Sequence, residues 1–148
     1  MSHCVLDASV AAKWFLPSDW ESYSTEAAQL FKRYEKDKLT LYVPDHFWIE
    51  MANVLVQAAC HKRWSQSEAR RALEALQELQ IRTFATRRFL PLAIRLALDF
   101  DHAVYDCVYV ALAMAMHCIF ITADEKLANK TAAKLPVKWL GTYDLVTI

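Results

Sequence analysis

The chain has 148 residues, of which 55% are hydrophobic, and its 17 basic side chains balance 17 acidic ones. This balance excludes a general electrostatic attraction to nucleic acid, so any such binding would depend on local patches. No apolar run reaches the roughly 20 residues that span a membrane, and the N-terminus lacks the basic start and cleavage site of a signal peptide. We therefore expect a cytoplasmic protein, without membrane contact, that folds as one domain over residues 1–148.

The first half of the chain alternates between predicted strands and predicted helices. Residues 4–6 form a short apolar run that predicts a strand, and the helical spacing of residues 10–16 ends at Pro17. A second helix is expected from about 19 to 38, and a second strand from 39 to 43. Asp45 is suited to cap a long helix that runs to about residue 63 and is almost entirely apolar between 47 and 60.

The second half continues the same alternation. Ser65 or Ser67 is suited to cap a charged amphipathic helix to about residue 80, which precedes a predicted strand over 81–84 and a helix over 86–98. The most apolar helix is expected over 103–116, followed by a strand over 118–121, a short helix over 125–133 and a strand over 137–140. Strands separated by helices predict an α/β fold with a mainly parallel sheet of four to five strands.

Four carboxylates stand out because each ends a strand or lies alone in an apolar helix. Asp7 follows the first strand, Asp124 follows the fourth, and Glu50 and Asp106 are isolated acids in the two most apolar helices. Asp7 and Asp124 can cap helices, and the positive end of a helix favours Asp106. Glu50 has the weakest structural explanation, although it could reach solvent or Lys13. The topology nevertheless places all four at the carboxyl edge of the sheet, where open α/β sheets bind their ligands.

Carboxylates held close together repel one another, so at neutral pH either some are protonated or a cation lies among them. An oxygen cluster without Cys or His at ligand spacing favours Mg²⁺ or Mn²⁺, and we expect His102 to be a helix-end residue. Such a centre is suited to phosphodiester hydrolysis. We expect Asp7 and Asp106 to bind the metal directly, while Glu50 and Asp124 complete the site through waters or a second ion.

The segments that carry these acids resemble the PIN-domain nucleases, and among them the VapC-type toxins of bacterial toxin–antitoxin pairs. The four motifs are VLDASVAAKWFL from Val5, IEMANVL from Ile49, VYDCVYVALA from Val104 and ITAD from Ile121. The resemblance covers almost the whole chain. It implies a three-layer α/β/α fold and a ribonuclease that depends on Mg²⁺ or Mn²⁺.

The resemblance also implies site residues and partners. The acids that match the family's catalytic and metal-binding positions are Asp7, Glu50, Asp106 and Asp124. Ser9 and Thr122 are implied as nearby hydroxyls, while Lys13 is expected either to touch a phosphate or to form an ordinary salt bridge. RNA is the implied substrate, a cognate antitoxin is implied to cover the site with its C-terminal segment, and homodimers are common in the family. The chain departs from the family pattern at Asp101, where Gly is common, and at Ala103, where Ser or Thr is common.

Two other classes of function remain open from the sequence. A magnesium-dependent phosphatase or phosphotransfer domain also gathers aspartates at a sheet edge, but it would need a nucleophilic Asp in a D-x-D or paired-acid turn, which the D-A-S of residues 7–9 does not supply. A nonenzymatic RNA- or protein-binding module on a PIN fold would be expected to have lost one or more of the acids. This chain keeps all four.

Overall fold

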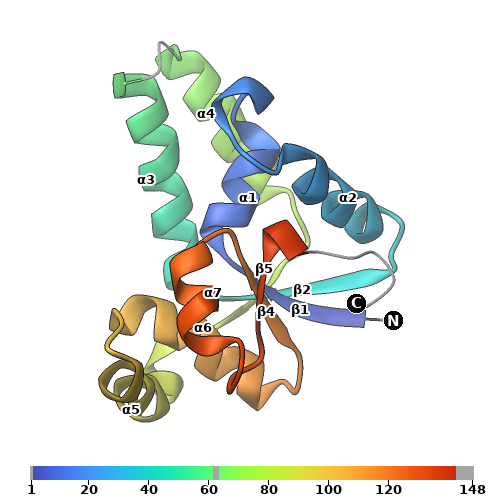
Figure 1. Ribbon diagram of the computed structural model, residues 1–148. Helices are drawn as coiled ribbons and strands as arrows, with labels where there is room; N and C mark the ends of the chain where they lie inside the picture. Colours follow the sequence, from blue (N-terminus) through green and yellow to red (C-terminus); the bar gives the residue numbers. More distant parts are fainter. Residues whose placement is uncertain (1, 62–63, 143–148) are drawn as a thin grey trace.

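A computed structural model describes residues 2–61 and 64–142, so the predicted helix end near residue 63 lies outside the described residues. Five strands form one sheet in the order β3-β2-β1-β4-β5, and every neighbouring pair is parallel (Figure 1). The strands are β1 (Ser2–Leu6), β2 (Leu39–Pro44), β3 (Arg82–Phe84), β4 (Ile119–Thr122) and β5 (Val137–Trp139). The predicted α/β fold with a parallel sheet is confirmed.

Seven α-helices connect these strands within the described ranges. They are α1 (Ala8–Phe15), α2 (Ser24–Glu35), α3 (His46–His61), α4 (Gln66–Gln77), α5 (Leu90–Phe100), α6 (Val104–Ala115) and α7 (Glu125–Thr131). Figure 1 shows α1 and α2 on one face of the sheet and α5 and α6 on the other, which gives the expected three layers. None of the helices in the described ranges is both long enough and apolar enough to cross a membrane.

The core is built around the three central strands and α6, which packs against β1, β2 and β4. Cys4, Val5 and Leu6 of β1 have no exposed surface, as expected for a parallel strand that is covered by helices on both faces. In α6, every residue from Cys107 to Ala113 is buried. The helix therefore lies fixed across the middle of the sheet, and its first turn is held at the carboxyl edge.

Two predicted helices are shorter than the sequence pattern suggested. The segment expected as one helix from about 19 to 38 begins with a short 3-10 turn, η1 (Ser18–Trp20), and α2 starts only after Tyr23, whose φ of 59° interrupts any continuous helix. The segment expected from residue 86 also begins as a 3-10 turn, η2 (Thr86–Phe89). Pro91 lies in the first turn of α5, where the missing N–H costs no hydrogen bond, so the α-helix starts there.

Candidate active site

The carboxyl edge of the sheet brings the four predicted acids into one cleft of about 310 Å³. Asp7 ends β1 and caps α1, and Asp124 follows β4 and caps α7. Glu50 lies in the second turn of α3, which follows β2, and Asp106 lies in the first turn of α6. The rest of the lining consists of Ala8, Ser9, Asn53 and Val54. The convergence inferred from the sequence is therefore present in the structure.

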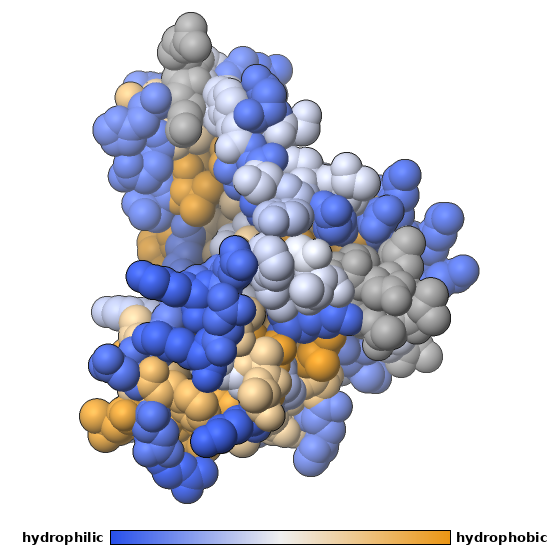
Figure 2. All heavy atoms as spheres, in the orientation of Figure 1, coloured by the Kyte–Doolittle hydropathy of each residue, from blue (hydrophilic) through white to orange (hydrophobic). Residues whose placement is uncertain are grey.

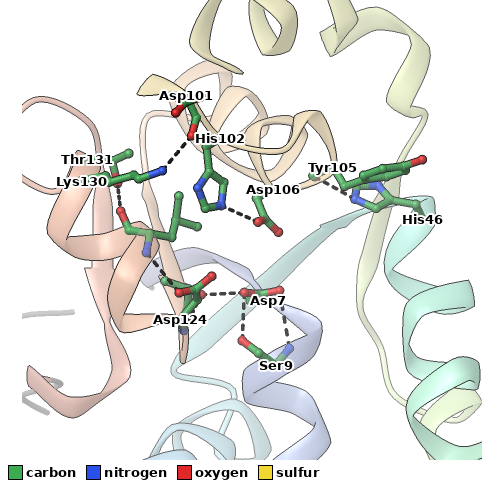
Figure 3. Close-up of polar contacts among 12 residues, drawn as sticks. Asp7, Ser9, His46, Asp101, His102, Tyr105, Asp106, Asp124, Lys130 and Thr131 are labelled. Carbon is green, nitrogen blue, oxygen red and sulfur yellow. Dashed lines mark hydrogen bonds and ion pairs between the residues drawn. The ribbon is translucent and has the colours of Figure 1, made fainter. Parts of the chain in front are cut away.

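Asp7 is held in place by two hydroxyl groups. Leu6 pairs with Ile121, so Asp7 and Thr122 are the next residues on neighbouring strands. The Thr122 hydroxyl donates to Oδ2 of Asp7 at 2.6 Å. The Ser9 hydroxyl donates to the same oxygen at 2.9 Å (Figure 3). The other oxygen, Oδ1, is 3.5 Å from the backbone nitrogen of Ser9 and is therefore the less occupied of the two.

The same two hydroxyls also accept backbone hydrogen bonds from the segment after β4. The Ser9 hydroxyl accepts from the N–H of Ala123 at 3.1 Å, and the Thr122 hydroxyl accepts from the N–H of Asp124 at 3.0 Å. Thr122 has no exposed surface, and its hydroxyl is used by its contacts with Asp7 and Asp124. These contacts join the ends of the two central strands into one rigid unit.

Glu50 is tied to α6 by a tyrosine that the sequence analysis did not single out. The Tyr109 hydroxyl donates to Oε1 of Glu50 at 2.8 Å, and Nε2 of His46 lies 3.3 Å from the same oxygen. Burial raises the pKa of Tyr109, so this residue remains a donor. The signal available in the sequence was its spacing, because Tyr109 follows Asp106 by three residues and therefore lies on the same side of the helix.

Two of the acids bind protons more tightly than usual. Burial raises the pKa of Asp7 to about 6, although the hydrogen bonds from Thr122 and Ser9 oppose this shift. Burial also raises the pKa of Glu50 to about 7, the Tyr109 hydrogen bond opposes the shift, and the charges of Asp7 and Asp106 add to it. No basic side chain lines the cleft among the described residues. A cluster of oxygen donors without a compensating positive charge fits a divalent cation.

His102 brings a nitrogen donor to this cluster. Its Nε2 lies 2.7 Å from Oδ2 of Asp106, and one potential ligand atom from each of His102, Asp106 and Asp124 lies within 4.8 Å of the other two (Figure 3). His102 is a helix-end residue, as expected, and it also joins a group of possible metal ligands that the sequence pattern did not indicate. Asp7 and Glu50 line the same cleft but are outside this compact group, and direct metal binding by Asp7 stays a prediction.

The loop before α6 explains why His102 faces the site. Asp101 ends α5 with a φ of 49°, a left-handed conformation that glycine adopts most readily, and its carbonyl accepts a hydrogen bond from Nζ of Lys130 at 2.7 Å. Gly is common at this position in the family that the sequence resembles, and the backbone geometry gives the reason. Ala103, the other departure, begins α6 without a side-chain cap.

Lys13 forms the salt bridge that the sequence analysis allowed as an alternative. Its Nζ lies 3.6 Å from Oε1 of Glu21, and its side chain is only 8% exposed. A contact between Lys13 and a substrate phosphate stays a prediction.

Known proteins resemble this chain in sequence and in fold. "Ribonuclease VapC9" of Mycobacterium tuberculosis is 29% identical over 97 residues, which cover 66% of this chain and 75% of that protein. The crystal structure of PAE2754 from Pyrobaculum aerophilum superposes with a TM-score of 0.67 at 20% identity and covers 95% of this chain and 91% of that one. A toxin–antitoxin complex from Klebsiella pneumoniae contains a chain with a TM-score of 0.64 at 15% identity, covering 96% of this chain and 99% of that one. At these identities the two solved structures show a shared fold.

The family model of the PIN domain matches residues 4–133. This range contains β2, β3, β4, most of β1 and all four acids of the cleft. The chain therefore belongs to the PIN-domain family.

Proposed function

We propose that the chain is a metal-dependent endoribonuclease and the toxin of a toxin–antitoxin pair, formed by one domain over residues 1–148. The observation that carries this proposal is the meeting of four carboxylates, from four separate segments, in a cleft whose described lining has no basic side chain. Membership of the PIN-domain family and the name of the mycobacterial ribonuclease support the same activity. RNA as the substrate agrees with action in the cytoplasm.

The donors of the cleft fit Mg²⁺ or Mn²⁺, which prefer carboxylate and water oxygens. Asp7, Glu50, Asp106 and Asp124, which line the cleft together, would hold the ion. When bound, the ion would lower the pKa of a coordinated water and stabilise negative charge on the scissile phosphate. The raised pKa values of Asp7 and Glu50, caused first by burial and then by neighbouring acids, agree with this fit, because a bound cation would favour their charged forms.

The remaining roles fall to the residues of the chain itself. Ser9 and Thr122 orient Asp7 through their hydrogen bonds to its Oδ2, and Tyr109 orients Glu50 through Oε1. The Glu50 side chain is 36% exposed, so it can be reached from the cleft. We assign to its carboxylate the acceptance of a proton from the attacking water, a role that suits a group whose pKa lies near neutrality.

The partner proposals depend on the surface of the protein. The Klebsiella neighbour was solved as a toxin–antitoxin complex, which supports an antitoxin that covers the cleft here. Exposed apolar side chains gather on one face of α5, at Leu90, Ile94 and Leu98, where Figure 2 shows a hydrophobic patch. Ile49 and Val56 are exposed on α3. These surfaces support a homodimer, since apolar side chains of this size are enriched at subunit interfaces.

Cleavage of RNA by the purified chain tests the proposal. We expect cleavage with Mg²⁺ or Mn²⁺, none after chelation by EDTA, and none in Asp7→Asn. The matched control is Asp99→Asn, which removes an exposed acid of α5 outside the cleft and should leave cleavage unchanged. An Asp7→Asn protein that melts like the parent and cuts equally well would contradict the assignment, and RNA binding without cleavage would favour the binding-module alternative.

A further inference from the structure

His102 differs from the four acids of the cleft because it offers a ring nitrogen that can bind a metal ion. Its Nε2 contacts Asp106 at 2.7 Å, and its side chain is only 13% exposed, against 27% for Asp106. The imidazole is therefore more buried than the carboxylate, and Figure 3 shows its ring directed at Asp106.

The distances among the three groups agree with one shared ion. Ligand bonds to small divalent cations are about 2.1 Å long, so two donors on opposite sides of one ion are about 4.2 Å apart, and neighbouring donors are closer. One atom from each of His102, Asp106 and Asp124 lies within 4.8 Å of the other two. Movements of a few tenths of an ångström would bring all three into a single coordination sphere.

The backbone around these donors is fixed before any ion binds. Asp101 places His102 through its left-handed conformation and is held by Lys130 of α7. Asp124 accepts the backbone N–H of Leu127 at 3.1 Å as the cap of the same helix. The loop that carries the imidazole and the helix that carries Asp124 are therefore joined to each other, as a preformed site requires.

We propose that His102, Asp106 and Asp124 bind the cation together, as a mixed nitrogen and oxygen centre that prefers a first-row transition-metal dication to Mg²⁺. Imidazole nitrogen is a ligand that transition metals accept readily and Mg²⁺ does not favour. On binding, the proton that Nε2 donates to Asp106 leaves to solvent, the neutral ring then carries its one proton on Nδ1, and the Nε2 lone pair faces the ion. This inference refines the metal of the proposed ribonuclease site and depends on that proposal only for its biological role.

The first test uses Mn²⁺ as a paramagnetic probe on the full chain, prepared without a histidine tag and without RNA. We expect electron spin echo measurements of the bound Mn²⁺ to show modulation from a ¹⁴N nucleus, and to change in the manner of ¹⁵N when the protein is labelled with ¹⁵N-histidine. The modulation should disappear in His102→Gln. It should persist in His46→Gln, the matched control, because His46 contacts Glu50 and not the three proposed ligands.

The second test compares affinities by calorimetry. His102→Gln should weaken Mn²⁺ binding by at least about tenfold and weaken Mg²⁺ binding less, so that the preference for Mn²⁺ falls. Absence of histidine modulation in the parent protein, or modulation that survives in His102→Gln, would overturn the inference, and the parent measurement does not depend on whether a variant folds. A chain that shows the histidine signal but cuts no RNA would overturn only the proposed function, whereas a chain that cuts RNA without the signal would overturn only this inference.

Discussion

Helices α4 and α6 each have 12 residues and carry a carboxylate at the third position, yet the two carboxylates do different things. Glu68 of α4 completes a capping box, in which its Oε2 accepts the N–H of Ser65 at 3.1 Å and its own N–H donates to the Ser65 hydroxyl at 3.0 Å. Asp106 of α6 faces the cleft and contacts His102, and its helix begins without a side-chain cap. The role of a carboxylate therefore depends on the groups that it contacts and not on its position in the helix.

The two helices also differ in how they are held. Only Leu76 of α4 is buried, whereas α6 buries every residue from Cys107 to Ala113. Because α4 buries little, its stability depends more on its capping box than that of α6, which is fixed by the core of the protein. This contrast means that function and stability should respond in opposite ways to changes in the two helices.

The largest expected effect comes from exchanging each carboxylate for its amide. Asp106→Asn should lower the rate of RNA cleavage by at least about a hundredfold, because loss of a charged ligand removes several kcal/mol of transition-state stabilisation. Thermal melting should stay near that of the parent, since the change relieves repulsion among the acids. Glu68→Gln should leave the cleavage rate unchanged. An equal loss of cleavage in Asp106→Asn and Glu68→Gln would contradict the different roles assigned to the two carboxylates.

The acids that face α6 should give the metal-free protein a pH dependence that Glu68 does not share. The pKa of Asp7 is raised to about 6 and that of Glu50 to about 7, so the folded state binds these protons more tightly than the unfolded chain. Their stabilising contribution is complete below the ordinary carboxylate pKa and is lost as the pH rises through 6 and 7. For Asp7 the loss is on the order of 3 kcal/mol, at about 1.4 kcal/mol for each pKa unit.

Melting temperatures from pH 4 to pH 8 in EDTA, repeated with Mn²⁺, test this dependence. The stabilisation by Mn²⁺ should grow as the pH rises, because the ion takes the place of the protons. Asp7→Asn should flatten the EDTA curve. A curve that rises steadily from pH 4 to pH 8 without metal would contradict the expected sign.

A smaller effect should follow from loosening Glu50 from α6. Tyr109→Phe removes the 2.8 Å hydrogen bond but keeps the ring in the core, so we expect about 1 kcal/mol of lost stability. Because this hydrogen bond lowers the pKa of Glu50, its loss should raise that pKa and move the acidic limb of the pH–rate profile to higher pH. Lower stability with an unmoved profile would show that Tyr109 only fills space.

The smallest effect is expected at the cap of α4. Ser65→Ala should cost about 1 kcal/mol of stability, the usual loss for an N-cap, measured by urea unfolding. RNA cleavage and Mn²⁺ affinity should not change, because the α4 cap makes no contact with the cleft. A change in metal affinity would show that α4 and the site are coupled.

Much of this arrangement could be predicted from residue patterns. Asp106 is conspicuous because burying an unpaired carboxylate in an apolar helix costs free energy. Ser65 followed by Glu68 is the pattern of a capping box, which marks the start of a helix. The alternation of apolar runs and helical spacings predicted the parallel sheet, and that topology sends Asp7 and Asp124 to the same edge. These predictions depend on periodicity, which is a local property of the sequence, and on strand direction, which follows from the connections between strands.

The missed features depend on loop geometry and on the register between strands. His102 precedes α6, so the spacing of helical neighbours did not predict its contact with Asp106, and it follows Asp101, whose left-handed backbone the sequence did not reveal. The hydroxyl contact between Thr122 and Asp7 depends on the pairing of Leu6 with Ile121, which no local pattern encodes. The tyrosine that holds Glu50 belongs to a different helix, and that contact is visible only once α3 and α6 are placed side by side.

The order of the strands has a consequence for how the protein is made. Of the five described strands, β1 is made before the others and becomes the middle of the sheet. Asp7, which follows it, accepts a hydrogen bond from a hydroxyl that lies 115 residues further along the chain. A nascent chain that has not reached β4 cannot assemble the cleft, however well its earlier segments have folded. The chain can therefore cleave RNA only after translation has passed Asp124, the last of the four acids to be made.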